Sequence, residues 1–142
     1  MQTGCATGKL SRLPLLQEGE DMLNPSTHFS PIRLSAYVRN EVEMDAAVRN
    51  EGDSPRWIEC DVSVPDAISL APDRPLPKGR IRIGILLPGG RISKKVKIYG
   101  GASSYPDTYA IRLTFYGYGS DGAIAERCEM KAELRCEKPG GA

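Results

Sequence analysis

The chain has few of the residues from which most active sites are built. Its 142 residues include one histidine, one tryptophan, two phenylalanines and four cysteines. The sequence has no G-x-S-x-G motif, no phosphate-binding loop and no H-E-x-x-H motif, and no cysteine lies beside an obvious base. The single histidine, His28, has no partners at metal-ligand spacing. We therefore expect a non-enzymatic protein with no catalytic residue, no metal site and no cofactor.

An excess of charge and long apolar runs are also missing. Nineteen Lys and Arg residues face eighteen Asp and Glu residues, for a formal net charge of +1. Binding to nucleic acid needs a basic excess on one face, so no such partner is expected. No apolar run approaches the roughly 20 residues of a transmembrane helix, and Ser11, Arg12 and Pro14 interrupt any secretory signal. We expect no membrane insertion and a cytoplasmic location, or an extracellular one if the sequence is an excised module.

The four cysteines show no C-x-x-C spacing. Cys128 and Cys136 lie eight residues apart on one predicted strand, about 26 Å at about 3.3 Å per residue, which is too far for a disulfide. Cys60 and Cys128 can approach each other only if their strands are neighbours. The favoured interpretation is that both are small buried apolar residues.

Turn-forming residues and period-two alternation, by contrast, are abundant. Fifteen glycines and eleven prolines separate short amphipathic segments, as an all-β fold requires. Four prolines between residues 65 and 79 exclude a central strand there and predict a crossover that touches the core through Ile68 and Leu70. Residues 1–31 are predicted to be a largely irregular tail, residues 32–137 a single domain and residues 138–142 a second tail. The predicted strands are residues 32–38, 41–49, 56–64, 80–86, 91–99, 109–118 and 123–136.

The clearest element is a hairpin within residues 105–136, with its turn at residues 119–122. Alternation favours an inward face on each of its strands. Parity is kept if Tyr118 lies opposite Ala123, which pairs Arg112 with Glu129 and Leu113 with Cys128. The predicted inward residues are Tyr109, Ile111, Leu113 and Phe115 on the first strand, and Ile124, Cys128, Met130, Ala132 and Leu134 on the second.

Seven amphipathic strands without a helix predict two antiparallel sheets packed face to face, with a barrel as the alternative. We expect residues 32–38, 41–49, 91–99 and 80–86 in one sheet, and residues 56–64, 109–118 and 123–136 in the other. Residues 80–86 and 91–99 would then pair, with Ile85 opposite Ile92 and Ile81 opposite Val96. Ile81, Ile83 and Ile85 would all point inward.

Four short segments carry a resemblance to a known family: residues 48–52, 87–90, 109–111 and 121–126. Across residues 32–137 the sequence resembles the immunoglobulin-like modules of archaeal and bacterial surface proteins, of the CARDB and related seven-stranded type. The resemblance implies an immunoglobulin-like β-sandwich and a spacer, adhesion or binding role. It also implies that the hydroxyl of Tyr109 ties the corner before its strand, which is a structural role.

Three aromatic residues are predicted to share an outward face, namely Trp57, Tyr116 and Tyr118. Antiparallel pairing of residues 56–64 with residues 109–118 brings the start of one strand to the end of the other, and so gathers the three rings. Exposed Trp and Tyr are typical of protein interfaces and of carbohydrate platforms. The rings can equally be covered by the N-terminal tail or pack only on each other.

Two functions follow from this patch. The first is a protein-interaction or assembly module that docks a partner through the patch or through an unpaired edge strand. The alternative is a carbohydrate-binding module that stacks sugars on the rings. A co-planar arrangement of Trp57 with a tyrosine would favour sugar, and a mixed, convex patch would favour protein.

Overall fold

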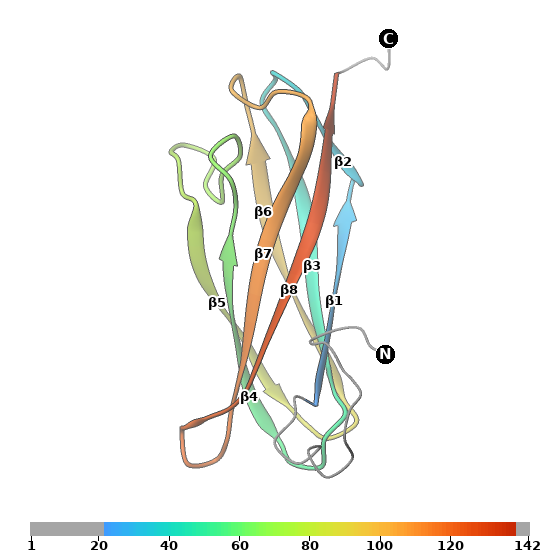
Figure 1. Cartoon of the computed structure of the whole chain (residues 1–142), viewed down its shortest axis with the longest axis vertical. Coiled ribbons are helices and arrows are strands. Elements are labelled where there is room, and N and C mark those ends of the chain that lie inside the picture. The colour runs from blue at the N-terminus through green and yellow to red at the C-terminus, as the bar shows by residue number, and fades with distance from the viewer. Residues whose placement is uncertain (1–21, 139–142) are drawn as a thin grey trace.

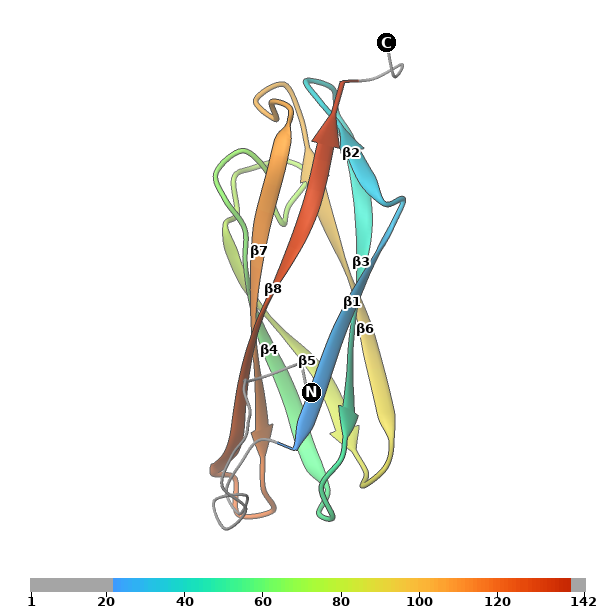
Figure 2. The ribbon, with the colours of Figure 1, turned by 45° about the vertical axis from the view of Figure 1, so that its right-hand side comes forward.

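The computed structural model describes residues 22–138, which form eight strands in two layers along one long axis (Figures 1 and 2). No helix long and apolar enough to cross a membrane is present in this described part of the chain. The strands are β1 (Leu23–Ser30), β2 (Arg33–Ser35), β3 (Asn40–Asn50), β4 (Arg56–Ser63), β5 (Lys78–Leu86), β6 (Arg91–Gly100), β7 (Asp107–Tyr118) and β8 (Ile124–Glu137). The prediction of an all-β sandwich is confirmed.

Each sheet differs from the prediction at both of its ends, because the strands predicted at residues 32–38 and 80–86 lie in the other sheet. One sheet has the order β1-β3-β6 and the other the order β2-β8-β7-β4-β5. Strand β5 pairs with β4 and not with β6, so the predicted pairs of Ile85 with Ile92 and Ile81 with Val96 are wrong. Residues 87–90 therefore carry the chain from one sheet to the other. Both strands are amphipathic, and alternation alone does not say which neighbour a strand takes.

Strand β1 was not predicted. Residues 23–30 were assigned to an irregular tail, yet they pair with β3 along their whole length, with Leu23 opposite Asn50 and Ser30 opposite Glu43. Pro25 and the polar residues around it conceal the strand in the sequence. At this edge position Pro25 needs no hydrogen-bond partner on its outer side. The rest of the predicted N-terminal tail, residues 1–21, lies outside the described residues.

The core fills the space between the two sheets. Its largest fully buried side chains include Phe115, Leu34, Met44, Ile58 and Ile98. Ile68 is buried and Leu70 packs against this core, so the predicted contacts of the proline-rich crossover are confirmed. Alternation predicted most of the inward residues of β3, β4 and β7 because one face of each strand covers the core.

The arrangement is immunoglobulin-like. The first strand region divides between the sheets, since β1 pairs with β3 while β2 runs parallel to β8. In place of a fourth strand in the smaller sheet, β5 extends the larger one, as an added strand does in variable-type domains. The Tyr109 hydroxyl donates a hydrogen bond to the carbonyl of Tyr105, four residues upstream. This is the predicted tyrosine corner, and its geometry is that of the immunoglobulin-like class.

The four outer strands each carry a feature that discourages pairing with another chain. β1 contains Pro25, and β2 is only three residues long. The charged residues of β5 and β6 are all Lys or Arg, which are typical of edge strands that do not pair with another chain. These cations are Lys78, Arg80 and Arg82 on β5, and Arg91, Lys94, Lys95 and Lys97 on β6.

Cys60 and Cys128 are both buried, as predicted, and they flank Phe115 in the register of β4, β7 and β8. Two strand spacings separate them, about 10 Å, which exceeds the reach of a disulfide of about 7 Å between Cα atoms. Burial is the main cause that raises the pKa of the Cys60 thiol to about 12, and the charge of Asp61 adds to it.

This pKa predicts a loss of stability in alkali. Above about pH 9 the unfolded chain loses the Cys60 proton while the folded protein keeps it, so the free energy of unfolding falls as pH rises toward 12. We expect the Cys60 thiol to account for about 2 kcal/mol of loss between about pH 8 and pH 10.5. Urea unfolding at both pH values measures it. Cys60→Ala should lower stability at pH 8 yet show a smaller alkaline loss, and an identical loss in both proteins would contradict the prediction.

Candidate functional site

An apolar row crosses the outer face of the five-stranded sheet near one end. Trp57 lies opposite Ile85 on one side and opposite Tyr118 on the other, and Tyr118 lies opposite Ile124. The exposed fractions are 38% for Trp57, 64% for Ile85 and 55% for Ile124, while Tyr118 is half-buried. We call Ile85, Trp57, Tyr118 and Ile124 the apolar row. Four large apolar side chains in adjacent register on a wet face form a contiguous patch.

Two β-bulges create the row. Between β4 and β5 the register changes at Ile58 and Glu59, so Ile83 is an extra residue and Ile85 turns outward. Between β7 and β8 it changes at Gly117 and Tyr118, and Ala125 is the extra residue between Ile124 and Glu126. One inserted residue flips every side chain beyond it to the other face. The predicted inward positions of Ile85 and Ile124 are therefore wrong.

Gly84 permits the first bulge. Its φ of +131° belongs to a region that residues with a side chain rarely adopt. A Cβ atom at this position would also lie 3.1 Å from Cδ1 of Ile92, on the facing sheet. Glycine is thus required both by the backbone and by the close approach of the two layers. The conformation at Gly84 decides which face Ile85 occupies.

The indole ring of Trp57 is fixed by its own strand. Its Nε1 donates a hydrogen bond of 2.8 Å to Oε2 of Glu59, whose other oxygen lies 3.4 Å from Nη1 of Arg80. The only polar group of the ring is therefore satisfied within the protein, and what remains exposed is hydrocarbon. A ring held in one orientation loses little freedom when a partner binds, which favours recognition.

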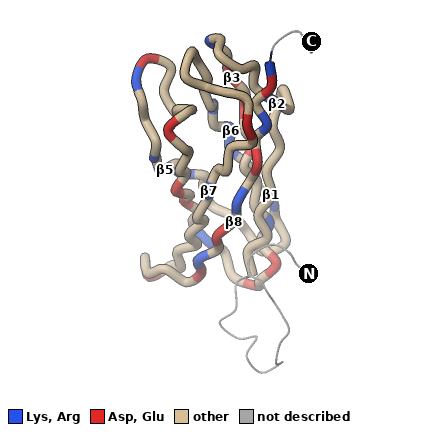
Figure 3. The backbone as a smooth tube through the Cα atoms, turned by 45° about the horizontal axis from the view of Figure 1, so that its top comes forward, with Lys and Arg blue, Asp and Glu red and all other residues tan. Residues whose placement is uncertain are grey.

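Beside the row, the outer face is charged and internally paired. Arg80 donates to both oxygens of Asp61, at 2.6 and 3.0 Å, and its guanidinium carbon lies 5.1 Å from the centre of the Tyr116 ring. Hydrogen bonding to Arg80 is the main cause that lowers the pKa of Asp61, and Tyr116 contributes. Across Tyr116, Arg127 forms an ion pair with Glu129. Figure 3 shows basic and acidic residues interspersed over these strands.

The three predicted patch residues are brought together as expected, but their roles differ. Tyr118 is the cross-strand neighbour of Trp57, whereas Tyr116 lies opposite Glu59. The rings of Tyr116 and Tyr118 are 6.4 Å apart and tilted by 31°, so they contact each other. Tyr116 is bound into the charged region by Arg80, and only Trp57 and Tyr118 belong to the apolar row.

Sequence reasoning missed Ile85 and Ile124. The signals that could have found them are the glycines next to the bulges, Gly84 and Gly117, because a glycine within a strand often marks a bulge. His28 lies exposed on β1. Within residues 22–138, no group of three or more His, Cys, Asp or Glu side chains is placed to hold a metal ion.

None of the protein-family models matches the chain, and neither does any curated protein. Among solved structures, the native conformation of E. coli alpha-2-macroglobulin is similar at a TM-score of 0.53 and 14% identity, over 82% of this chain and 7% of that one. The sporulation control protein Spo0M of Bacillus subtilis matches at a TM-score of 0.42 and 11% identity, over 82% of this chain and 50% of that one. The ASH/PapD-like domain 7 of human CEP192 matches at 0.46 and 11%, over 94% and 97%. At these identities the likeness to alpha-2-macroglobulin concerns the fold alone.

Proposed function

We propose that the protein is a non-enzymatic protein-interaction module whose docking surface is the apolar row. The observation that carries the proposal is the placement of four large apolar side chains across four adjacent strands on an otherwise charged face. Interface cores are depleted in charge and enriched in aromatic residues, and a charged rim commonly surrounds them. The resemblance to CARDB-type modules implies a spacer, adhesion or binding role, and docking through the apolar row is compatible with the last two.

A protein partner is favoured over a carbohydrate. Sugar platforms combine an aromatic ring with free polar groups that bind hydroxyls, but Glu59 beside Trp57 is already engaged by the indole and by Arg80. The ends of the row are branched aliphatic residues, Ile85 and Ile124, which offer a sugar neither a π-face nor a hydrogen bond. The paired charges and short, bulged or proline-containing edges also favour docking on the face over pairing at an edge strand.

Photo-crosslinking tests the proposal. A photoreactive residue at position 118 should capture a specific protein in the native cell extract, and mass spectrometry identifies it. With that partner purified, Trp57→Ala should weaken binding by about 30-fold, because truncating a central interface aromatic costs about 2 kcal/mol.

The matched variants are Ile85→Ser and Ile32→Ser, since the two isoleucines are 64% and 67% exposed and only Ile85 lies in the row. We expect Ile85→Ser to weaken binding and Ile32→Ser to leave it unchanged. Equal effects of the two variants, or a Trp57-dependent signal on a glycan array without a protein partner, would overturn the proposal.

A further inference from the structure

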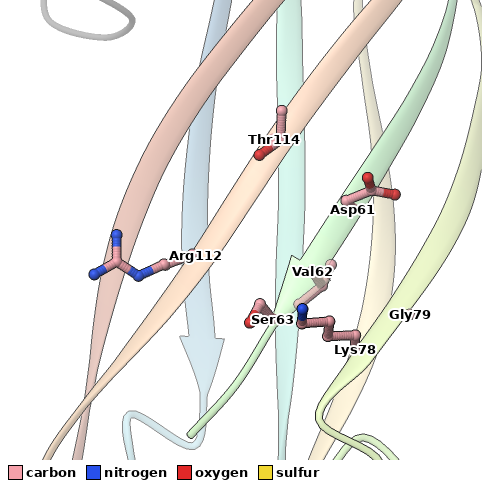
Figure 4. A pocket seen from close by; sticks show the side chains of 7 residues that line it. All are labelled: Asp61, Val62, Ser63, Lys78, Gly79, Arg112 and Thr114. Carbon is pink, nitrogen blue, oxygen red and sulfur yellow. The ribbon is translucent and has the colours of Figure 1, made fainter.

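A cleft lies on the same outer face as the apolar row, at the far end of β4. From Trp57 to Ser63 is six residues along the strand, about 20 Å at about 3.3 Å per residue. The cleft has a volume of about 460 Å³ and is lined by residues 61–63, Lys78, Gly79, Arg112 and Thr114. Figure 4 shows these side chains on β4, β5 and β7. The space is large enough for a small ionic group with its hydration shell.

Three cations lie in one cross-strand row beside this cleft, with Ser63 between the first and the second. Ser63 lies opposite Lys78 on one side and opposite Arg112 on the other, and Arg112 lies opposite Lys131 on β8. Arg112 and Lys131 are therefore directly opposite each other, and like charges in that position repel. The predicted pair of Arg112 with Glu129 would have relieved this repulsion, but the true register is shifted by two residues, which keeps the parity and places Glu129 opposite Thr114.

No carboxylate in the described part of the chain neutralises this row. Among residues 22–138, none of Lys78, Arg112 and Lys131 takes part in an ion pair within 4.0 Å. The one carboxylate that lines the cleft, Asp61, is held by both hydrogen bonds from Arg80. The cleft therefore carries a local excess of positive charge in a protein whose net charge is only +1.

Hydroxyl groups complete the lining. Ser63 and Thr114 are half-buried, and their side chains form no hydrogen bond to any residue described in the structure. In Figure 4 the Lys78 ammonium group lies near Ser63, while Arg112 lines the cleft from β7 with its guanidinium directed away from Ser63, toward β8. Guanidinium, ammonium and hydroxyl donors around one space are the set that binds oxyanions.

We propose that this cleft binds an oxyanion, either a phosphoryl group or a carboxylate, against Lys78 and the hydroxyls of Ser63 and Thr114, with Arg112 at the edge of the cleft. The anion would offset the local excess of positive charge that Lys78 and Arg112 bring to the cleft. This site is separate from the apolar row and goes beyond the proposed function, since it names a second ligand chemistry on the same face. Either oxyanion can be free in solution or carried by a partner.

Amide NMR tests the proposal with sodium phosphate and sodium succinate as probes, against sodium chloride at equal ionic strength. We expect saturable shifts at Ser63, Gly79 and Thr114 with at least one probe. A stronger response to phosphate identifies a phosphoryl ligand, and a stronger response to succinate a carboxylate. Lys78→Gln with Arg112→Gln should weaken binding by about tenfold or more, because hydrogen bonds to charged groups are lost.

The control variant is Arg91→Gln with Lys94→Gln, which removes the same charge from β6, on the other sheet. It should leave the shifts unchanged, and so should Trp57→Ala, which separates this site from the docking surface. The proposal is overturned by the absence of saturable shifts with both probes. It is also overturned if chloride produces the same shifts, or if the control variant weakens binding as much as the test variant.

Discussion

Replacing Arg56 with methionine should lower the free energy of unfolding by about 3 kcal/mol. Nε of Arg56 lies 3.0 Å from Oε1 of Glu126, and the two side chains are only 20% and 7% exposed. Without its partner, Glu126 would remain as a buried carboxylate, and breaking a buried ion pair in this way costs about 3–5 kcal/mol. The partial exposure of Arg56 places the expected loss at the lower end of that range.

Removing both partners of this ion pair should lower the free energy of unfolding much less than removing one of them. Because desolvation offsets most of the attraction in a buried pair, the double variant Arg56→Met, Glu126→Met should lie within about 1 kcal/mol of wild type. Arg74→Met is the control, since Arg74 and Asp73 form an exposed pair and should contribute no more than about 0.5 kcal/mol. Urea unfolding measures all three. A double variant as unstable as Arg56→Met alone would refute this account of the pair.

Asn50→Ala should cost about 3 kcal/mol as well. The Asn50 side chain is buried, its Nδ2 donates to the carbonyls of Ser54 and Leu86, and its Oδ1 accepts from the amide of Gly52. Alanine would leave all three backbone groups without this partner, and each unsatisfied buried group costs about 1–3 kcal/mol. Water reaching the more exposed of them reduces the sum.

The comparison for this prediction is Asn24→Ala. Asn24 makes one exposed side-chain bond, to Glu51, and its loss should change stability by no more than about 0.5 kcal/mol. Thermal and urea unfolding of both variants decide the matter. If the two variants lost the same free energy of unfolding, the hydrogen bonds of the Asn50 side chain to Gly52, Ser54 and Leu86 would not be stabilising. If only Asn50→Ala lowers the stability, the turn at Leu87 and the end of β5 should also become less ordered. The backbone of Asn50 exchanges hydrogen bonds with Gly89 and Gly90, so a displaced Asn50 would disturb that turn.

The sequence predicted the sandwich and most of its core because burial on one face imposes a period of two, which is visible without a structure. The hairpin of β7 and β8 shows the limit of this information. From Glu126 onward its parity was right although the pairing slipped by two residues, since a shift of two keeps a side chain on its face, whereas the bulge before Glu126 moved Ile124 to the other face. Turn length and bulges set the register, and neither is encoded in the alternation.

The candidate site was only half predictable for the same reason. The sequence predicts Trp57 and Tyr118 close together because it predicts their strands to be antiparallel neighbours, which they are. Ile85 and Ile124 were assigned to the core, since the alternation of their strands was continued through the two bulges. The assignment of β5 to the wrong sheet removed Ile85 from this face as well. The two β-bulges, which residue propensities do not predict, thus determined which side chains form the apolar row.

The protection of all four outer strands has a consequence for the behaviour of the protein at high concentration. Amyloid-like fibrils grow when strands from many chains stack edge to edge at about 4.8 Å. Here the cation-bearing edges of β5 and β6 would place like charges against each other in every added layer, and β1 and β2 offer a proline and a very short strand. Growth of this kind is therefore disfavoured at all four outer strands.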